Sequence, residues 1–288
     1  MTRMIGTDNA GEPLDPVALN DMSLLFRNIA SLTGAQDPDG RWVFRGVSDY
    51  EYELIPSVGR HPAVGGSYEV ACALEEWLFS RFRRRALVDL GIAELMSIRD
   101  ACAEVDRFAA QFSGQGGGET SLGEQWVWTA LMQHFGVPTR FLDWSESPWV
   151  ALYFACAEDH DRHGSVYILD KVKLTKELDD RLATPVKLFP RQGTPSKDAI
   201  QVIDVPHAFR RVANQLGLFT VTDNPCEDHR ELLRGRLRGS QAFRKWRIPS
   251  HVKRPMLGQL RRMGITPHAV FPGLGGLAQT IRDELSAL

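Results

Sequence analysis

Apolar residues recur at helical spacing in the first half of the chain and form strand-like runs in the second half. Residues 69–85 carry an apolar side chain every three or four positions, which is the spacing of one face of an α-helix. Residues 164–170 (GSVYILD) form a nearly continuous apolar run typical of a buried β-strand. Because the helical segments mainly precede the strands instead of alternating with them, the pattern predicts an α+β fold. We expect a mixed or antiparallel sheet built largely from the C-terminal half, and helices mainly in the N-terminal half.

The complete set of predicted elements follows from this periodicity and from the positions of glycine and proline. Gly136 is a natural end for one helix, and Pro148 fits the first turn of the next. Residues 1–20 are polar and contain Gly and Pro, so we expect a flexible lead-in followed by a single domain over residues 21–288. The predicted helices are 21–33, 69–85, 94–112, 124–134, 147–157, 251–263 and 276–287; the predicted strands are 42–44, 164–170, 199–205, 217–221, 243–248 and 269–271; residues 207–215 are predicted as a short helix or turn.

The composition excludes several classes of protein. The 288 residues are 43% hydrophobic and 24% charged, with a net charge of −2, so there is no global basic field to hold nucleic acid or an acidic membrane. No run approaches the ~20 apolar residues of a membrane span, and we expect a cytoplasmic protein without a membrane partner. The four cysteines are widely spaced and form no C-x-x-C pair. They are therefore expected to be free thiols, and no bound metal is expected.

The segment 132–156 (MQHFGVPTRFLDWSESPWVALYFAC) concentrates the chemistry of the chain. His134 is either a general acid or base, or a residue whose charge offsets the dipole at the end of its helix. Arg140 and Asp143 are three positions apart, and we expect them to pair and hold the turn. Trp144 either packs in the core or forms a flat wall for a bound ring.

A second dense segment, 42–60, places Arg45 and Gly46 just after a predicted strand. An arginine there can hold a phosphate or carboxylate through two hydrogen bonds, and a glycine lets a ligand approach the backbone. The alternative is a structural ion pair beside a turn glycine. Gln215 offers an amide near a strand start, where it either satisfies backbone groups or binds a sugar hydroxyl. We expect one pocket to be built from Arg45, Ser48, Arg60, His134, Arg140, Asp143, Tyr153 and Gln215.

Four parts of this sequence together resemble the FRG domain family: Phe44-Arg45-Gly46, Pro56-Ser57 with Arg60, the QHFGVPTRFLDW block at 133–144, and ALYFA at 151–155. Weaker similarity continues downstream, so the resemblance covers residues 42–288. Members of that family occur in bacterial and phage proteins, some beside defence or toxin genes. One departure is visible at 271–276, where FPGLGG replaces the usual FPDLDG and both carboxylates are lost.

The order of strand, Arg-Gly and a later Tyr-Phe-Ala helix is similar in organisation to ADP-ribosyltransferases. This analogy implies an NAD-directed transferase or glycohydrolase, with NAD as the substrate and a protein or nucleic acid as the acceptor. Loss of nicotinamide needs a carboxylate, and the late strands offer no evident glutamate; Glu227 and Glu231 are the nearest candidates. The residues implied for catalysis are Arg45, His134, Asp143 and Gln215; those implied for binding the nucleotide are Arg45, Gly46, Ser48, Arg60, Arg140, Trp144 and Tyr153.

Two alternatives remain open. The first is a binding module without turnover, which holds a nucleotide or a nucleic acid with the help of the basic run 81–85 and the basic segment 230–247. That segment can equally be a solvated basic surface. The second is hydrolysis of another nucleotide or nucleic acid, in which His134 and Asp143 assist a water molecule or a metal.

Overall fold

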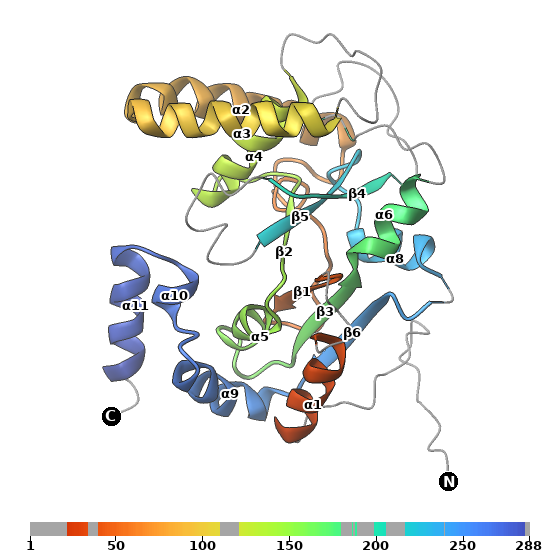
Figure 1. Ribbon diagram of the computed structural model, residues 1–288, viewed down its shortest axis with the longest axis vertical. Helices are drawn as coiled ribbons and strands as arrows, with labels where there is room; N and C mark the ends of the chain where they lie inside the picture. Colours follow the sequence, from red (N-terminus) through yellow and green to blue (C-terminus); the bar gives the residue numbers. More distant parts are fainter. Residues whose placement is uncertain are drawn as a thin grey trace.

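A central antiparallel sheet organises the molecule (Figure 1). The computed structural model describes residues 22–33, 40–109, 121–179, 186, 188, 199–205, 217–238 and 240–285. Within these ranges the sheet has six strands in the order β4-β5-β2-β1-β3-β6, and every neighbouring pair is antiparallel. The strands are β1 (Trp42–Val47), β2 (Leu142–Ser145), β3 (Gly164–Asp170), β4 (Ile200–Ile203), β5 (Gly217–Thr222) and β6 (Phe243–Ile248).

Two groups of helices lie at opposite ends of one face of the sheet, and α6 and α8 lie against the other face (Figure 1). In the first group, α2, α3 and α4 pack near β4 and β5, and in the second, α1, α5 and α9 pack near β1, β3 and β6. The helices are α1 (Met22–Thr33), α2 (Tyr68–Asp89), α3 (Ile92–Ala109), α4 (Leu122–His134), α5 (Pro148–Cys156), α6 (Lys171–Asp179), α8 (His229–Arg236), α9 (Ser250–Arg262), α10 (Pro267–Val270) and α11 (Leu274–Leu285).

The alternation of side chains along β1 divides the core between the two faces. Phe44 packs against α5 in one apolar cluster, whereas Val43 belongs to a cluster on the opposite face with Leu174 of α6 and Leu233 of α8. A third cluster joins α3 and α4 to Phe219 of β5. The two helix groups on the first face therefore leave a strip of sheet between them, and this strip becomes the floor of the site.

Several local features of the sequence act as predicted. The left-handed φ of +77° at Gly136 follows the end of α4, as expected for a terminating glycine. Ser147 caps α5 by accepting a hydrogen bond from the backbone N–H of Val150, and Pro148 occupies the first turn. These two signals lie on either side of residues 137–146, which contain most of the QHFGVPTRFLDW block.

The α+β class is confirmed, with two corrections to the distribution of elements. Four of the six described strands lie beyond residue 163, as expected for the sheet. Six of the ten described helices begin beyond residue 144, so the expected concentration of helices in the N-terminal half holds only for the two longest, α2 and α3. The predicted strand 269–271 is wrong, because Thr266 accepts a hydrogen bond from the N–H of Ala269 and starts the short helix α10 instead. Strand β2 and helices α6 and α8 were not predicted. The lead-in 1–20 and the segment 207–215 lie outside the described residues.

The helices within the described ranges are all too short or too polar to cross a lipid bilayer.

Candidate functional site

The three residues Phe44, Arg45 and Gly46 have separate roles in β1. Phe44 is 1% exposed and packs in the core under α5. A Cβ atom on Gly46 would lie 1.7 Å from the carbonyl oxygen of Ala151, so only glycine lets α5 sit this close to the strand. Arg45, between them, starts on the opposite face of the sheet. The role expected for Gly46, close approach of a ligand, is therefore corrected in part, because it is helix α5 that comes so close.

Arg45 fills a gap between β1 and β2. These two strands pair only at Phe44 and Ser145, and the Nη1 of Arg45 donates a 2.7 Å hydrogen bond to the backbone carbonyl of Asp143. The same Nη1 lies 3.9 Å from the Asp143 carboxylate. Its Nε is buried and has no hydrogen-bond partner among the described residues. The guanidinium is thus held in place while retaining capacity for another acceptor.

The charge on Arg45 is only partly balanced by its surroundings. Burial lowers the pKa of Arg45, Asp143 opposes this effect, and the positive charge of Arg60 reinforces it. The Asp143 side chain is 53% exposed, so water weakens its attraction for the guanidinium. Arg45 remains charged at neutral pH. Its environment therefore favours an additional anion.

Two hollows meet at Arg45. The first has a volume of about 270 Å³ and the second of about 240 Å³, and both are lined by Arg45, Gly46, Phe154 and Phe271. The first lies over the strip of sheet between the two helix groups, because its walls come from α4 on one side and α5 on the other. A ligand that occupied both hollows would therefore contact Arg45.

The first hollow combines apolar walls with a few polar groups. His134 and Gln133 line it from the end of α4, and Asp143 lines it from β2. The His134 ring stands edge-on to Phe135, with centroids 4.8 Å apart. The Oε1 of Gln133 accepts a short hydrogen bond from the Thr139 hydroxyl, which fixes the amide. His134 and Asp143 are thus brought together as predicted, and Gln133 joins them.

The second hollow is more polar. It contains the predicted residues Ser48, Arg60 and Tyr153, together with Glu53 and Glu158. The hydroxyl of Ser48 donates a 2.6 Å hydrogen bond to Asp159, so it is already engaged. Burial, aided by the charges of Asp283 and Glu158, raises the pKa of Tyr153 to about 12. Tyr153 therefore stays protonated and can donate a hydrogen bond.

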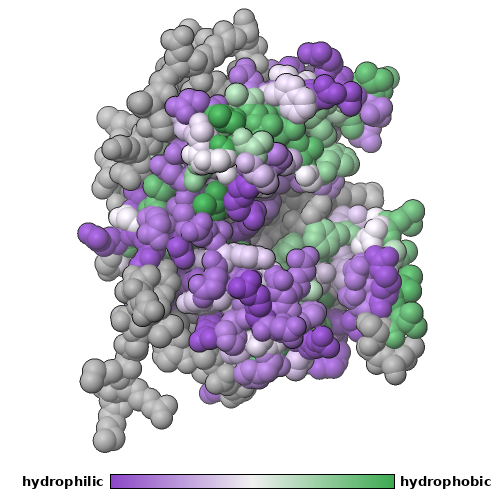
Figure 2. Space-filling view, turned by 180° about the vertical axis from the view of Figure 1, so that it is seen from behind, coloured by the Kyte–Doolittle hydropathy of each residue, from purple (hydrophilic) through white to green (hydrophobic). Residues whose placement is uncertain are grey.

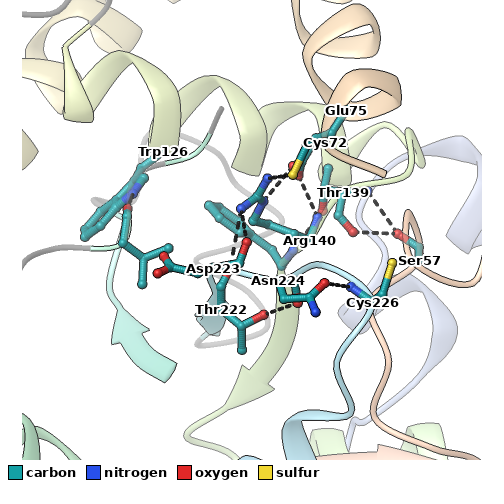
Figure 3. Close-up of polar contacts among 12 residues, drawn as sticks. Ser57, Cys72, Glu75, Trp126, Thr139, Arg140, Thr222, Asp223, Asn224 and Cys226 are labelled. Atoms are coloured by element: carbon teal, nitrogen blue, oxygen red, sulfur yellow. Dashed lines mark hydrogen bonds and ion pairs between the residues drawn. The ribbon is translucent and has the colours of Figure 1, made fainter. Parts of the chain in front are cut away.

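The expected pair between Arg140 and Asp143 is wrong, and so is the role of Arg140 in binding a ligand. Arg140 is fully buried and lines neither hollow; its Nε donates a 2.6 Å hydrogen bond to Glu75 of α2 (Figure 3). Its Nη1 donates to the backbone carbonyl of Asp223 at 3.0 Å. Burial opposes the charge, but Glu75 outweighs it, and the pKa of Arg140 lies above its ordinary value. Arg140 is a structural tie between α2, the turn before β2 and the end of β5.

Trp144 forms part of the first hollow, but its indole N–H points into the protein. It donates a 2.9 Å hydrogen bond to the Thr220 hydroxyl, which also lies 2.9 Å from Nδ1 of His229. His229 is fully buried, and burial together with the charge of Arg45 lowers its pKa to about 3. A neutral imidazole thus lies close to Arg45. Sequence reasoning missed His229, because no local pattern marks it.

The remaining predicted residues take different positions. Gln215 lies outside the described residues. Neither Glu227 nor Glu231 is among the residues lining the two hollows, and Glu231 forms ion pairs with Arg230 and Arg234. In the part of the chain that the structure describes, no three His, Cys, Asp or Glu side chains are close enough together to hold a metal ion.

Some cations of the basic segment 230–247 contact other groups of the protein. Arg230 lies 3.2 Å from Asp228 on α8. On β6, the guanidinium carbon of Arg244 lies 4.9 Å from the Trp42 ring centroid, and the Nζ of Lys245 donates a 2.8 Å hydrogen bond to the backbone carbonyl of Tyr50. Several of these cations are therefore used within the protein.

Residues 40–164 match the model of the FRG domain family. The chain contains an FRG domain. The matched span supplies every lining residue of the second hollow except Phe271. It also supplies those of the first hollow except Gly217, Phe219 and Phe271. The weaker similarity beyond residue 164, including Phe271, falls outside this span. Among curated proteins and solved structures, no match was found.

The structure gives each residue of the Phe44-Arg45-Gly46 motif a separate physical role. Phe44 anchors β1 in the core, Gly46 admits α5, and Arg45 is delivered to the junction of the two hollows. The wall residues that sequence reasoning missed include Gln133, Phe154 and Phe271, together with Phe219, Glu53 and Glu158. Gln133 and Phe154 each adjoin a predicted site residue, His134 or Tyr153, so their positions in the motif were a usable signal.

Proposed function

We propose that this FRG domain is a nucleotide-directed enzyme that binds NAD at Arg45. The observation that carries the proposal is the position of this guanidinium between two hollows, with a buried Nε that has no partner among the described residues. Arginine is suited to phosphate oxygens because several N–H groups can donate at once. A second cation, Arg60, lines the second hollow and adds to the attraction for an anion.

Two hollows on either side of one cation suit a molecule with two ring-bearing ends and an anionic centre. NAD has this form, with a pyrophosphate between two nucleosides. The aromatic walls of the first hollow, Phe219 and Phe271, suit the nicotinamide ring. The carboxylates of Glu53 and Glu158 in the second hollow can accept hydrogen bonds from ribose hydroxyls.

The chemistry we propose is cleavage of the bond between nicotinamide and ribose. The bonding electron pair leaves with the nicotinamide nitrogen, and positive charge develops on the ribose. Asp143 supplies a carboxylate at the first hollow that would stabilise this charge. Water or an acceptor nucleophile then adds to the ribose carbon and gives up its proton, for which His134 is the proposed base. The acceptor is either a protein or a nucleic acid.

The test measures thermal stability and nicotinamide release on the same samples of purified protein with NAD. At about 100 times the dissociation constant, binding adds roughly 2.7 kcal/mol to the free energy of unfolding. We expect this stabilisation in the wild type and in Arg99→Ala, which alters an exposed arginine on α3, and its loss in Arg45→Ala. Asp143→Asn should keep binding and lose release, because it removes the charge without changing the shape.

Each outcome of this test supports or rejects one class of function for the protein. Release that depends on Arg45 and Asp143 supports the enzyme. Stabilisation without release in the wild type would instead support the alternative, a nucleotide-binding module without turnover. If NAD changes neither stability nor nicotinamide level, the NAD proposal is rejected, and nucleic-acid binding with a salt titration becomes the next experiment.

A further inference from the structure

A second concave surface lies on α2, away from Arg45. It is an apolar groove with a volume of about 520 Å³, here called the α2 groove, and it shares no lining residue with either hollow. Trp77 and Phe135 are 54% and 62% exposed although both are large aromatic residues. The apolar side chains that form it are Trp77, Leu78, Phe82, Ala86, Leu90, Phe135 and Val137.

The α2 groove is long enough, and walled on two sides, so that it can hold a helix. The groove residues contributed by α2 and its C-cap are adjacent pairs that repeat every four positions, from Trp77 to Leu90. They therefore follow one face of the helix for about 20 Å. Phe135 and Val137, from the turn after α4, form the opposite wall. An amphipathic helix presents apolar residues at intervals of three and four positions, and these fill such grooves.

Apolar surface also continues beyond the end of the groove. Val88 in the last turn of α2 and Ile92 at the start of α3 are 83% and 79% exposed, and Met96 of α3 is 50% exposed. Figure 2 shows apolar side chains gathered over the upper part of the molecule, where Figure 1 places α2 and α3. Exposed apolar surface of this extent is characteristic of contact sites for other proteins.

The rim of the α2 groove is cationic. Arg81 and Arg85 line it one helical turn apart, and neither lies within ion-pair distance of a carboxylate among the described residues. Arg83, on another face of α2, differs because it lies 2.6 Å from Glu124. The Arg81 guanidinium lies 5.1 Å from the Trp77 ring centroid, next to the apolar floor. Asp89 contributes one negative charge at the far end.

We propose that the α2 groove binds an amphipathic helix of a partner protein, with acidic residues flanking its apolar face. The apolar floor would take the buried side chains, and Arg81 and Arg85 would pair with the flanking carboxylates. The charge of the rim selects this partner over a basic helix, because like charges beside an apolar contact are unfavourable.

The experiment uses the full chain and a pair of fluorescein-labelled synthetic peptides of about 16 residues, long enough to span the groove as a helix. One peptide has leucine at helical spacing with flanking glutamates, and its control has lysine in place of every glutamate. Fluorescence anisotropy measures both dissociation constants. We expect the glutamate peptide to bind at least about tenfold more tightly than the lysine peptide, with a preference that weakens in high salt.

Protein variants locate the contact. Trp77→Ala, at an exposed position, should weaken binding of the glutamate peptide by about tenfold or more, since aromatic anchors dominate such contacts. The double variant Arg81→Glu with Arg85→Glu should reverse the preference between the peptides. A matched double variant on α9, Arg254→Glu with Arg262→Glu, should not. Circular dichroism checks that each variant remains folded.

Three results would overturn the proposal: no binding of either peptide, equal binding of both, or binding unaffected by Trp77→Ala. Light scattering on the free protein tests a different occupant. If the chain forms dimers that Trp77→Ala dissociates, a second copy fills the groove and the acidic-helix proposal is rejected.

Discussion

Arg45 and Arg140 both lie in the motif blocks of this chain, yet their surroundings are opposite. Arg45 borders two hollows and lies 3.9 Å from a half-exposed carboxylate. Arg140 is fully buried and is bound by Glu75, a residue 65 positions earlier in the chain. A charge buried to this degree requires a close partner of opposite sign. The type of residue was visible in the sequence, but the partner that decides its role was not.

At the residue scale, the lowered pKa of His229 predicts that the free energy of unfolding falls in acid. Its pKa is about 3 in the folded protein and near 6.5 in an unfolded chain, so the unfolded chain takes up a proton that the folded state excludes. The stabilisation is complete above pH 6.5 and is lost as the pH falls toward 3. Over that range the loss is on the order of 5 kcal/mol from this group.

Urea unfolding at several pH values between 7.5 and 4 tests this prediction. Carboxylates also contribute to acid unfolding, so the informative quantity is the difference between wild type and His229→Gln. The variant should be less stable at neutral pH and should lose less stability on acidification. His251→Gln, at an exposed histidine on α9, is the control and should follow the wild type. A His229→Gln curve parallel to that of the wild type would contradict the prediction.

At the scale of elements, the contact between β1 and α5 determines the shape of the site. Gly46 lets the backbone of α5 approach, and α5 then supplies Phe154 to both hollows. Lys253 of α9 contacts the ends of both elements, because its Nζ donates hydrogen bonds to the backbone carbonyls of Ser48, Glu158 and Asp159. The buried ammonium thus satisfies three carbonyl groups at the ends of β1 and α5.

We predict that Gly46→Ala lowers stability by about 3 kcal/mol or more, because the new methyl group would meet the backbone carbonyl of Ala151 at 1.7 Å. The matched control is Gly258→Ala in the middle of α9, where an added Cβ meets no atom within 4 Å. That change should stabilise the protein by roughly 0.5–1 kcal/mol, since alanine is the better helix former. Thermal unfolding of the two variants beside the wild type gives the comparison. Equal effects would show that β1 and α5 are not in close contact.

At the scale of the whole molecule, the three apolar clusters lie on the faces of one sheet. The sheet connects them through strands that alternate their side chains between clusters, as Val43 and Phe44 do. Damage to one cluster is therefore expected to weaken the whole. The expectation of a single domain over residues 21–288 leads to a calorimetric prediction.

Scanning calorimetry should give one unfolding transition, and core variants at distant sites should both lower its midpoint. Met132→Ala on α4 and Met256→Ala on α9 remove buried side chains from different clusters, each at a cost of about 2–5 kcal/mol. Met96→Ala, at a half-exposed methionine, should change stability by less than about 0.5 kcal/mol. Two transitions, only one of which moves in each core variant, would indicate separate folding units.

Features that depend on neighbouring residues could be predicted from the amino-acid sequence alone. Helical periodicity, the glycine after α4 and the proline that starts α5 are local signals, because backbone conformation and capping involve residues a few positions apart. The four-residue strand β2 lacked such a signal, whereas β4, equally short, lies in the longer run 199–205 that the pattern did predict as a strand. The small number of residues in 269–271 explains why it was assigned as a strand, although the Thr266 cap makes it a helix.

The way these elements form a site depends on contacts between distant parts of the chain, which only the folded structure shows. The tertiary structure joined Arg45 to Asp143 across 98 positions, buried Arg140 against Glu75, placed a neutral His229 near Arg45 and assembled the α2 groove from α2 and the turn after α4. Each of these results depends on which surfaces exclude water and which charges then come together. Burial changes the free energy of a charge far more than its neighbours in sequence do, and burial is a property of the folded chain.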